Sequence, residues 1–126
     1  MLTECGSDRV YLACGATDLR KSIDGLAALV QYSFALDPFA GAWFVFCNRD
    51  RDKLKILLWD HNGFWLYYRR LEKGRFHWPA AESTPQAGTV SAAMQMITRR
   101  QLSWLLDGLT LTQRCAHQPL SPRCAL

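Results

Sequence analysis

Basic and aromatic side chains gather between residues 53 and 79, a combination that suits contact with a nucleic acid. Lysine and arginine side chains neutralise phosphates, which gives affinity without sequence information. Tryptophan and tyrosine rings stack on unpaired bases, worth roughly 1–3 kcal/mol per base. The residue types therefore predict a nucleic-acid-binding surface in this stretch. Its candidate residues are Lys53, Lys55, Arg69, Arg70, Arg75, Trp59, Trp65 and Tyr67.

The positive charge of the chain is concentrated in the same stretch. The formal net charge is +4. Residues 48–75 hold eight Lys or Arg against four Asp or Glu, and the rest of the chain is balanced. A local excess of this kind is typical of a surface that binds a polyanion. The alternative is a solvated sheet face whose cations protect an edge, with the aromatic rings packed beneath helices.

A second pair of cations, Arg20 and Lys21, opens the first predicted helix. Positive side chains at a helix N-terminus oppose the helix dipole by some tenths of a kcal/mol. The pair therefore suggests a phosphate site shared with the backbone amides near Thr17. The alternative is that both side chains form salt bridges with Asp18 or Asp24.

No arrangement of residues in the sequence predicts catalysis. A metal-dependent nuclease needs two or three carboxylates around Mg²⁺, and the candidates are Asp60, Glu72, Asp18 and Asp24. We expect Asp60 at a turn, Asp18 at a helix cap and the other two in solvent. We therefore predict no catalytic residue, no bound metal and no cofactor.

The five cysteines are odd in number and form no CxxC pair, which indicates reduced thiols in a cytoplasmic protein. Cys14 and Cys47 lie in apolar runs and are expected to be buried. A zinc site from Cys115, His117 and Cys124 would lack a fourth ligand at the usual spacing.

Residues 53–79, which contain most of the binding candidates, are predicted to form three short strands joined by two turns. Asp60-His61-Asn62-Gly63 is a strong turn signal, and Lys73-Gly74 is a weaker one. We favour a type I turn closed by a Gly63 bulge, because it separates apolar from basic residues. A two-residue Asn62-Gly63 turn would mix the two sets.

In the favoured register Lys55 faces Arg69, and Trp59 faces Trp65. One face of the hairpin then carries Lys53, Lys55, Trp59, Trp65, Tyr67 and Arg69. The other face carries Leu54, Ile56, Leu58, Leu66 and Tyr68.

Apolar spacing supplies the remaining elements. Strands are predicted over 10–14, 42–48 and 90–97, the second of them covered on both sides. Helical spacing predicts one long helix over 18–35 and a short helix over 99–106, with Thr98 as its N-cap and Gly108 as its stop. The predicted fold class is α+β: a mainly antiparallel β-meander of about five strands packed against the long helix, with a short C-terminal helix.

The chain of 126 residues is long enough for one domain with a real core. We assign that domain to residues 1–112 and expect 113–126 to be a disordered tail. The sequence shows neither a membrane-spanning run nor a secretory signal, so we expect a cytoplasmic protein.

Four ordered stretches give the chain a family resemblance: VYLACGATDLRKSIDGLAALV, DPFAGAWFVFCNR, LKILLWDHNGFWLYYRRLEKGRFHWP and QLSWLLDGL. Together they resemble the accessory protein of IS66 insertion sequences, also called TnpB or the second-reading-frame protein, over residues 10–109. The resemblance implies a bacterial mobile element and a role beside a separate, larger transposase. It implies no known reaction and no established catalytic residues.

The function expected from residues and resemblance together is that of a non-catalytic accessory protein of DNA transposition. It would contact DNA at the insertion-sequence ends through the basic hairpin face, with the transposase as partner. The first alternative is a protein-interaction module that binds the transposase and never DNA, with Trp59, Trp65 and Tyr67 as its contacts. The second alternative is a metal-dependent nuclease of unrecognised type.

Overall fold

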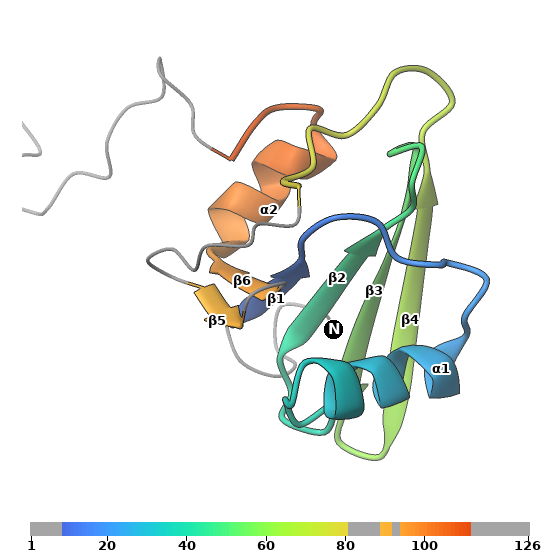
Figure 1. Ribbon diagram of the computed structural model, residues 1–126, viewed down its shortest axis with the longest axis vertical. Helices are drawn as coiled ribbons and strands as arrows, with labels where there is room; N and C mark the ends of the chain where they lie inside the picture. The colour runs from blue at the N-terminus through green and yellow to red at the C-terminus, as the bar shows by residue number, and fades with distance from the viewer. Residues whose placement is uncertain (1–8, 81–88, 92–93, 112–126) are drawn as a thin grey trace, which may run out of the picture.

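The computed structural model describes residues 9–80, 89–91 and 94–111, which form a six-stranded sheet with a helix against each face (Figure 1). The elements in chain order are β1 (Val10–Ala13), α1 (Ile23–Ala28), the π-helical turn η2 (Leu29–Ser33), β2 (Trp43–Cys47), β3 (Lys53–Asp60), β4 (Gly63–Arg70), β5 (Thr89–Ser91), β6 (Met94–Ile97) and α2 (Arg99–Leu106). The strand order is β4-β3-β2-β1-β6-β5. β1 and β2 run parallel, and the other neighbouring strands are antiparallel.

The predicted antiparallel meander against one long helix is wrong. β1 and β2 are joined by a crossover that carries α1 and η2, and a crossover of this length is what a parallel pair requires. β6 then returns to the free side of β1 instead of extending the sheet beyond β4. The fold is therefore a mixed sheet covered on both faces.

The first helix is shorter than predicted, because it begins at Ile23 and its π-helical continuation ends at Ser33. The Asp18 carboxylate accepts a hydrogen bond from the backbone N–H of Arg20 at 3.1 Å. This bond closes a local turn instead of capping a helix. Ser22 takes the N-cap position in an extended conformation. Because the helix begins only at Ile23, the segment before it is not helical and lines the surface of the sheet.

The predicted third strand of the 53–79 stretch is also wrong. The chain does reverse at Gly74, whose φ is +85°, but the residues that follow form no strand. Phe76 and Trp78 are instead buried against the sheet. The indole N–H of Trp78 donates to the carbonyl of Ala13 at 2.8 Å, which ties this segment to the end of β1.

Two apolar clusters hold the sheet between its helices. On one face Leu102 and Leu105 of α2 pack with the 76–78 segment over alternate residues of β1, β2 and β3. On the other face Leu26 and Val30 pack over the intervening residues, including Leu57 of β3. All five residues of β2 are buried, which confirms the expectation of a strand covered on both sides.

The C-terminal helix α2 confirms its prediction in detail. Thr98 and Gln101 form a reciprocal capping box: the Gln101 N–H donates to Thr98 Oγ1 at 3.0 Å, and the Thr98 N–H donates to Gln101 Oε1 at 2.9 Å. Gly108 follows the helix with φ +83°. The strand predicted over 90–97 is divided between β5 and β6. The predicted tail over 113–126 lies outside the described residues.

Candidate nucleic-acid interface

The β3–β4 hairpin closes with a two-residue loop, His61-Asn62, between paired Asp60 and Gly63. His61 has a φ of 60°. The N–H of Asn62 donates to the carbonyl of Asp60 at 2.5 Å, which is the bond of a γ-turn. The favoured turn with a Gly63 bulge is therefore wrong, and the two-residue loop is one position earlier than the alternative.

The observed register divides the predicted binding residues between the two faces of the hairpin. Lys55 faces Tyr68, and Trp59 faces Phe64. A shift of one residue on β4 moves each of its side chains to the opposite face. Lys53, Lys55, Trp59 and Arg70 therefore lie on the α1 side of the sheet. Trp65, Tyr67 and Arg69 lie on the α2 side.

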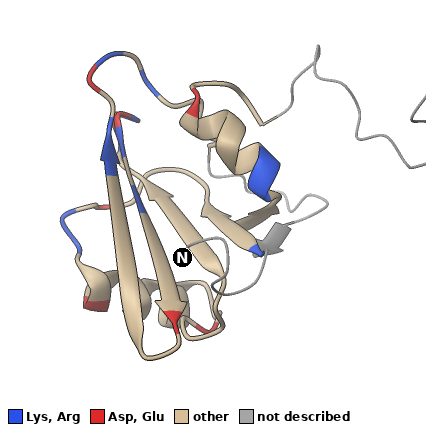
Figure 2. Cartoon of the chain, turned by 180° about the vertical axis from the view of Figure 1, so that it is seen from behind, with Lys and Arg blue, Asp and Glu red and all other residues tan. Residues whose placement is uncertain are grey.

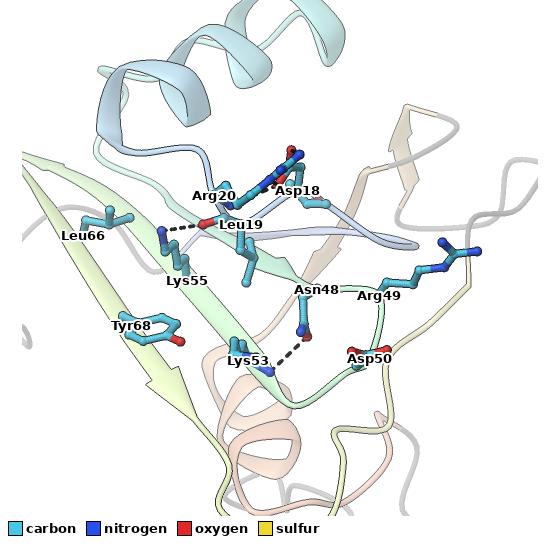
Figure 3. A pocket seen from close by; sticks show the side chains of 11 residues that line it. Asp18, Leu19, Arg20, Asn48, Arg49, Asp50, Lys53, Lys55, Leu66 and Tyr68 are labelled. Atoms are coloured by element: carbon cyan, nitrogen blue, oxygen red, sulfur yellow. Dashed lines mark hydrogen bonds and ion pairs between the residues drawn. The ribbon is translucent and has the colours of Figure 1, made fainter.

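A groove of about 660 Å³ lies on the α1 side, between the segment before α1, the turn after β2, and strands β3 and β4 (Figure 3). Four cationic side chains line it against two carboxylates, so its charge is positive. Three of those cations were predicted and the fourth, Arg49, was not. The lining residues are Thr17, Asp18, Leu19, Arg20, Asn48, Arg49, Asp50, Lys53, Lys55, Leu66 and Tyr68. We call this hollow the basic groove.

Lys55 lies at the floor of the basic groove, where its ammonium is held by the backbone. Nζ donates to the carbonyl of Leu19 at 2.6 Å (Figure 3). It also donates to the carbonyl of Lys21 at 3.1 Å. It also lies 5.7 Å from the centroid of the Tyr68 ring. Lys55 therefore holds the segment before α1 against the sheet. The sequence pattern did not predict this role.

Arg20 forms a two-bonded ion pair with Asp18, with Nε and Nη2 each 3.0 Å from a carboxylate oxygen. This confirms the salt-bridge alternative for Arg20. The Arg20 hydrogen bonds lower the pKa of Asp18 from 3.8 to about 2. Lys21 is exposed and does not line the groove. The amide of Thr17 is bonded to the carbonyl of Cys47 at 2.8 Å, so it is already occupied within the fold.

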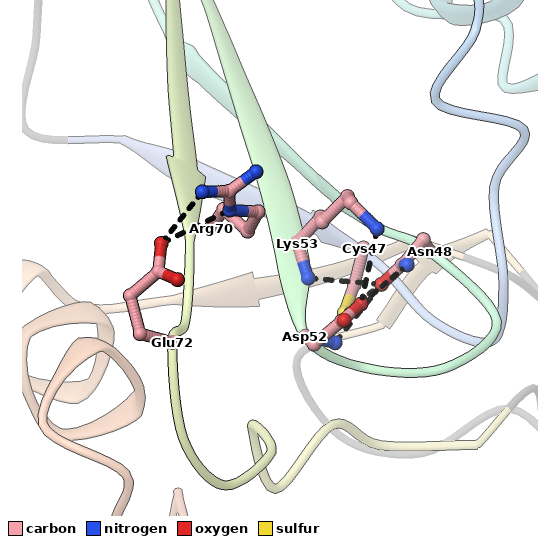
Figure 4. A network of polar contacts seen from close by, with 6 residues as sticks. All are labelled: Cys47, Asn48, Asp52, Lys53, Arg70 and Glu72. Carbon is pink, nitrogen blue, oxygen red and sulfur yellow. Dashed lines mark hydrogen bonds and ion pairs between the residues drawn. The ribbon is translucent and has the colours of Figure 1, made fainter.

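Asn48 builds the turn that carries Arg49 between β2 and β3 (Figure 4). Its side-chain oxygen accepts the N–H groups of Asp52 and Lys53 at 3.1 and 3.0 Å, and its amide donates to the Asp52 carboxylate at 2.7 Å. The last bond lowers the pKa of Asp52. Cys47 is buried, as expected from its apolar run, and burial raises the pKa of its thiol to about 12.

The other basic candidates cluster near the same end of the sheet. Lys and Arg residues occur together where β3 begins and β4 ends (Figure 2), whereas β3 ends at the hairpin with Asp60. Arg70 is paired with Glu72 at 2.9 Å, and Lys53 lies 3.7 Å from Asp52. Arg75 lines a neighbouring hollow with Arg49 and Arg51. The cations of the β2–β3 turn, the start of β3 and the end of β4 therefore lie at one end of the sheet.

The aromatic candidates do not share one surface. Trp65 and Tyr67 stack along β4 on the α2 side, with centroids 5.9 Å apart, and Trp65 is 52 % exposed. The Trp65 indole N–H donates to Asp60 at 3.1 Å. Trp59 lies on the α1 side, where it packs against Phe39 and Phe64 with centroid distances of 4.9 Å. These three rings cannot stack on one nucleic-acid strand through a single face of the sheet.

Two residues of the basic groove were missed by sequence reasoning for identifiable reasons. Tyr68 was assigned to the apolar face because the register was wrong by one residue. Arg49 was counted only within the charge excess of residues 48–75, although it lies two residues after the end of a buried strand. Its position after β2 was the one available signal.

The nuclease candidates do not converge on a metal site. Asp18, Asp60 and Glu72 are each bonded to a nearby donor of their own: Arg20, Trp65 and Arg70. Within the described ranges, no group of three metal-ligating side chains occurs. The candidate ligands Cys115, His117 and Cys124 lie outside those ranges. Over the same residues, neither helix has the length and apolar character needed to cross a bilayer.

Comparison with known proteins identifies the family. The sequence model described as "IS66 Orf2 like protein" matches residues 8–116. The uncharacterized protein y4hO of Sinorhizobium fredii (strain NBRC 101917 / NGR234) is 38 % identical over 109 residues, which cover 86 % of this chain and 87 % of y4hO. The uncharacterized protein y4jC of the same strain is 37 % identical over 71 residues, 56 % of this chain and 61 % of y4jC. No solved structure matches the chain. The resemblance is thus confirmed, and the chain belongs to the IS66 Orf2-like family of accessory proteins associated with transposition.

Proposed function

We propose that this protein is a non-catalytic accessory factor that binds the DNA of its insertion sequence in the bacterial cytoplasm, alongside the transposase. The observation that carries the proposal is the basic groove with the cationic end of the sheet beside it. Arg49 has no ion pair with any described residue, and Lys53 has only a loose one at 3.7 Å. Such cations are available for phosphates.

The distribution of charge supports binding of DNA at one end of the sheet, where β3 begins and β4 ends. Arg49, Arg51, Lys73 and Arg75 are all exposed and lie on loops next to the groove. Clustered cations raise the local concentration of a polyanion and speed its association. Because they contact phosphates, they provide affinity, whereas any preference for the insertion-sequence ends requires base contacts.

The test is binding of the purified full-length chain to DNA by fluorescence anisotropy across a salt series. The DNA comprises the terminal repeats of the element and a scrambled sequence, each as duplex and as single strand. We expect log affinity to fall linearly with log salt, by about 0.9 per phosphate contacted on duplex DNA. Absence of binding at low salt would contradict the proposal.

The second candidate, a protein-interaction module for the transposase, is favoured by one specific observation. The stacked Trp65–Tyr67 pair lies on β4, an edge strand, with more than half of Trp65 exposed. Exposed aromatic rings are frequent anchors of protein interfaces. Under this reading Trp65→Ala abolishes co-purification with the transposase, whereas charge reversal in the basic groove leaves it intact.

A further inference from the structure

We infer that the basic groove accepts an unpaired stretch of one or two nucleotides, so that the DNA form preferred by this protein is single-stranded. The inference rests on the proposed function and specifies its ligand. Its starting point is the size of the groove, about 660 Å³. This is the volume range of small-molecule sites, roughly 300–1,000 Å³. A nucleotide is a ligand of that size, whereas a duplex can only pass across the mouth of such a hollow.

The groove contains a surface for a base. Tyr68 is 55 % exposed and lies on β4 at the wall of the groove, with Leu66 two residues before it on the same face (Figure 3). An exposed ring beside an aliphatic side chain is unfavourable in water and suits a stacked base of any sequence. Lys55 Nζ lies over one face of the Tyr68 ring, 5.7 Å from its centroid, and places a positive charge there.

Two further cations line the same groove as the ring. Lys53 is on the neighbouring strand, where it faces Arg70, and Arg49 is on the turn before it. Both line the same hollow as Tyr68. Arg20 has its guanidinium engaged by Asp18 and is 90 % exposed, so it lies at the rim. The combination of a base platform with two available cations is that of a single-strand site.

Hydrogen bonds hold the segments that line the groove, which favours binding without a large ordering cost. Asn48 fixes the turn before β3 through three hydrogen bonds. Lys55 fixes the opposite wall through the carbonyls of Leu19 and Lys21. The groove is thus formed before a ligand enters.

The experiment compares Tyr68→Leu, Tyr68→Phe and the unchanged full-length chain. Each is titrated into a fluorescently labelled single-stranded 12-mer and into the duplex of the same sequence. The matched control is Tyr32→Leu, because Tyr32 is a tyrosine 79 % exposed on η2 that does not line the groove. Circular dichroism and thermal melting establish that each variant is folded.

We expect the single strand to bind more tightly than the duplex. Tyr68→Leu is expected to weaken single-strand binding by about 5- to 160-fold, the effect of losing one stacked base. Tyr68→Phe and Tyr32→Leu are expected to keep the original affinity. An oligonucleotide with 2-aminopurine at successive positions should show quenching at one or two positions, and Tyr68→Leu should remove it.

Two results separate this inference from the proposed function. If Arg49→Glu weakens binding of both DNA forms while Tyr68→Leu changes neither, the protein binds DNA but the single-strand site is refuted. Equal or tighter binding of the duplex refutes it as well. If neither form binds, the inference and the proposed function fall together.

Discussion

The ammonium of Lys55 donates to the carbonyl oxygen of Leu19 at 2.6 Å, across 36 positions of sequence. A lysine on β3 therefore holds in place the segment that carries Arg20. Its second bond, to the carbonyl of Lys21, completes the attachment. The sequence alone predicts that Lys55 contacts phosphate. In the structure, Lys55 instead holds two segments of the groove together.

Lys55→Met is expected to lower the free energy of unfolding by about 1–3 kcal/mol, because it leaves two carbonyl groups without their charged donor. Methionine keeps the apolar stem, so packing changes little. Urea denaturation measures the effect. The control is Lys73→Met, since Lys73 is exposed and has no ion pair among the described residues, and such surface changes stay within about 0.5 kcal/mol. Equal urea midpoints for the two variants would show that Lys55 does not fasten the segment.

The ion pair between Arg20 and Asp18 predicts a pH effect. The folded-state pKa of Asp18 is lowered from 3.8 to about 2 by the Arg20 hydrogen bonds. The group therefore contributes stability that is present above about pH 4 and is lost as the pH falls through about 2. Carbon-13 NMR of the Asp18 carboxyl should titrate near pH 2, and Arg20→Gln should return its midpoint toward 3.8. A midpoint already near 3.8 in the unchanged chain would contradict the ion pair.

The effect of a charge reversal on DNA binding should depend on which face of the sheet carries the substituted residue. Arg49 lines the basic groove, whereas Arg69 lies on the α2 side beside Leu54. Arg49→Glu is expected to weaken binding and to reduce the salt slope by about one. Arg69→Glu carries the same change of charge and is expected to have the smaller effect. The salt series measures both, and a larger effect of Arg69→Glu would place the DNA on the opposite face.

The Cys47 thiol is expected to resist alkylation in the folded protein. It is fully buried, and burial raises its pKa to about 12, so the reactive thiolate is scarce at pH 8. Iodoacetamide treatment followed by peptide mass mapping should leave Cys47 unmodified until urea unfolds the chain. Modification without denaturant would mean that β2 opens in the native state.

Some parts of the fold were predictable because their signals are local. The burial of β2 follows from an unbroken apolar run, and the ends of α2 follow from Thr98, Gln101 and Gly108. These features depend on residues close together in sequence. Propensity and capping therefore identified them without knowledge of the tertiary structure.

The register of the hairpin was not predictable from its turn, because Asp60 to Gly63 suits more than one loop. The burial of Leu57 decides which register the hairpin adopts. Leu57 lies on the same face as Lys55 and Trp59, and it is fully buried beneath α1. The sequence does show four successive apolar residues at 56–59, a sign that β3 is covered on both faces. The strand order was beyond local reasoning, since β6 pairs with β1 across most of the chain.

The bond between the Thr17 N–H and the Cys47 carbonyl, at 2.8 Å, joins the start of the crossover after β1 to the last residue of β2. The walls of the groove therefore come from chain segments about thirty residues apart, and neither wall exists in the unfolded chain. A ligand that occupies the groove binds only the native state, so it raises the melting temperature with increasing ligand concentration. Recognition by this protein is thereby coupled to folding of the whole β1–β2–β3 unit.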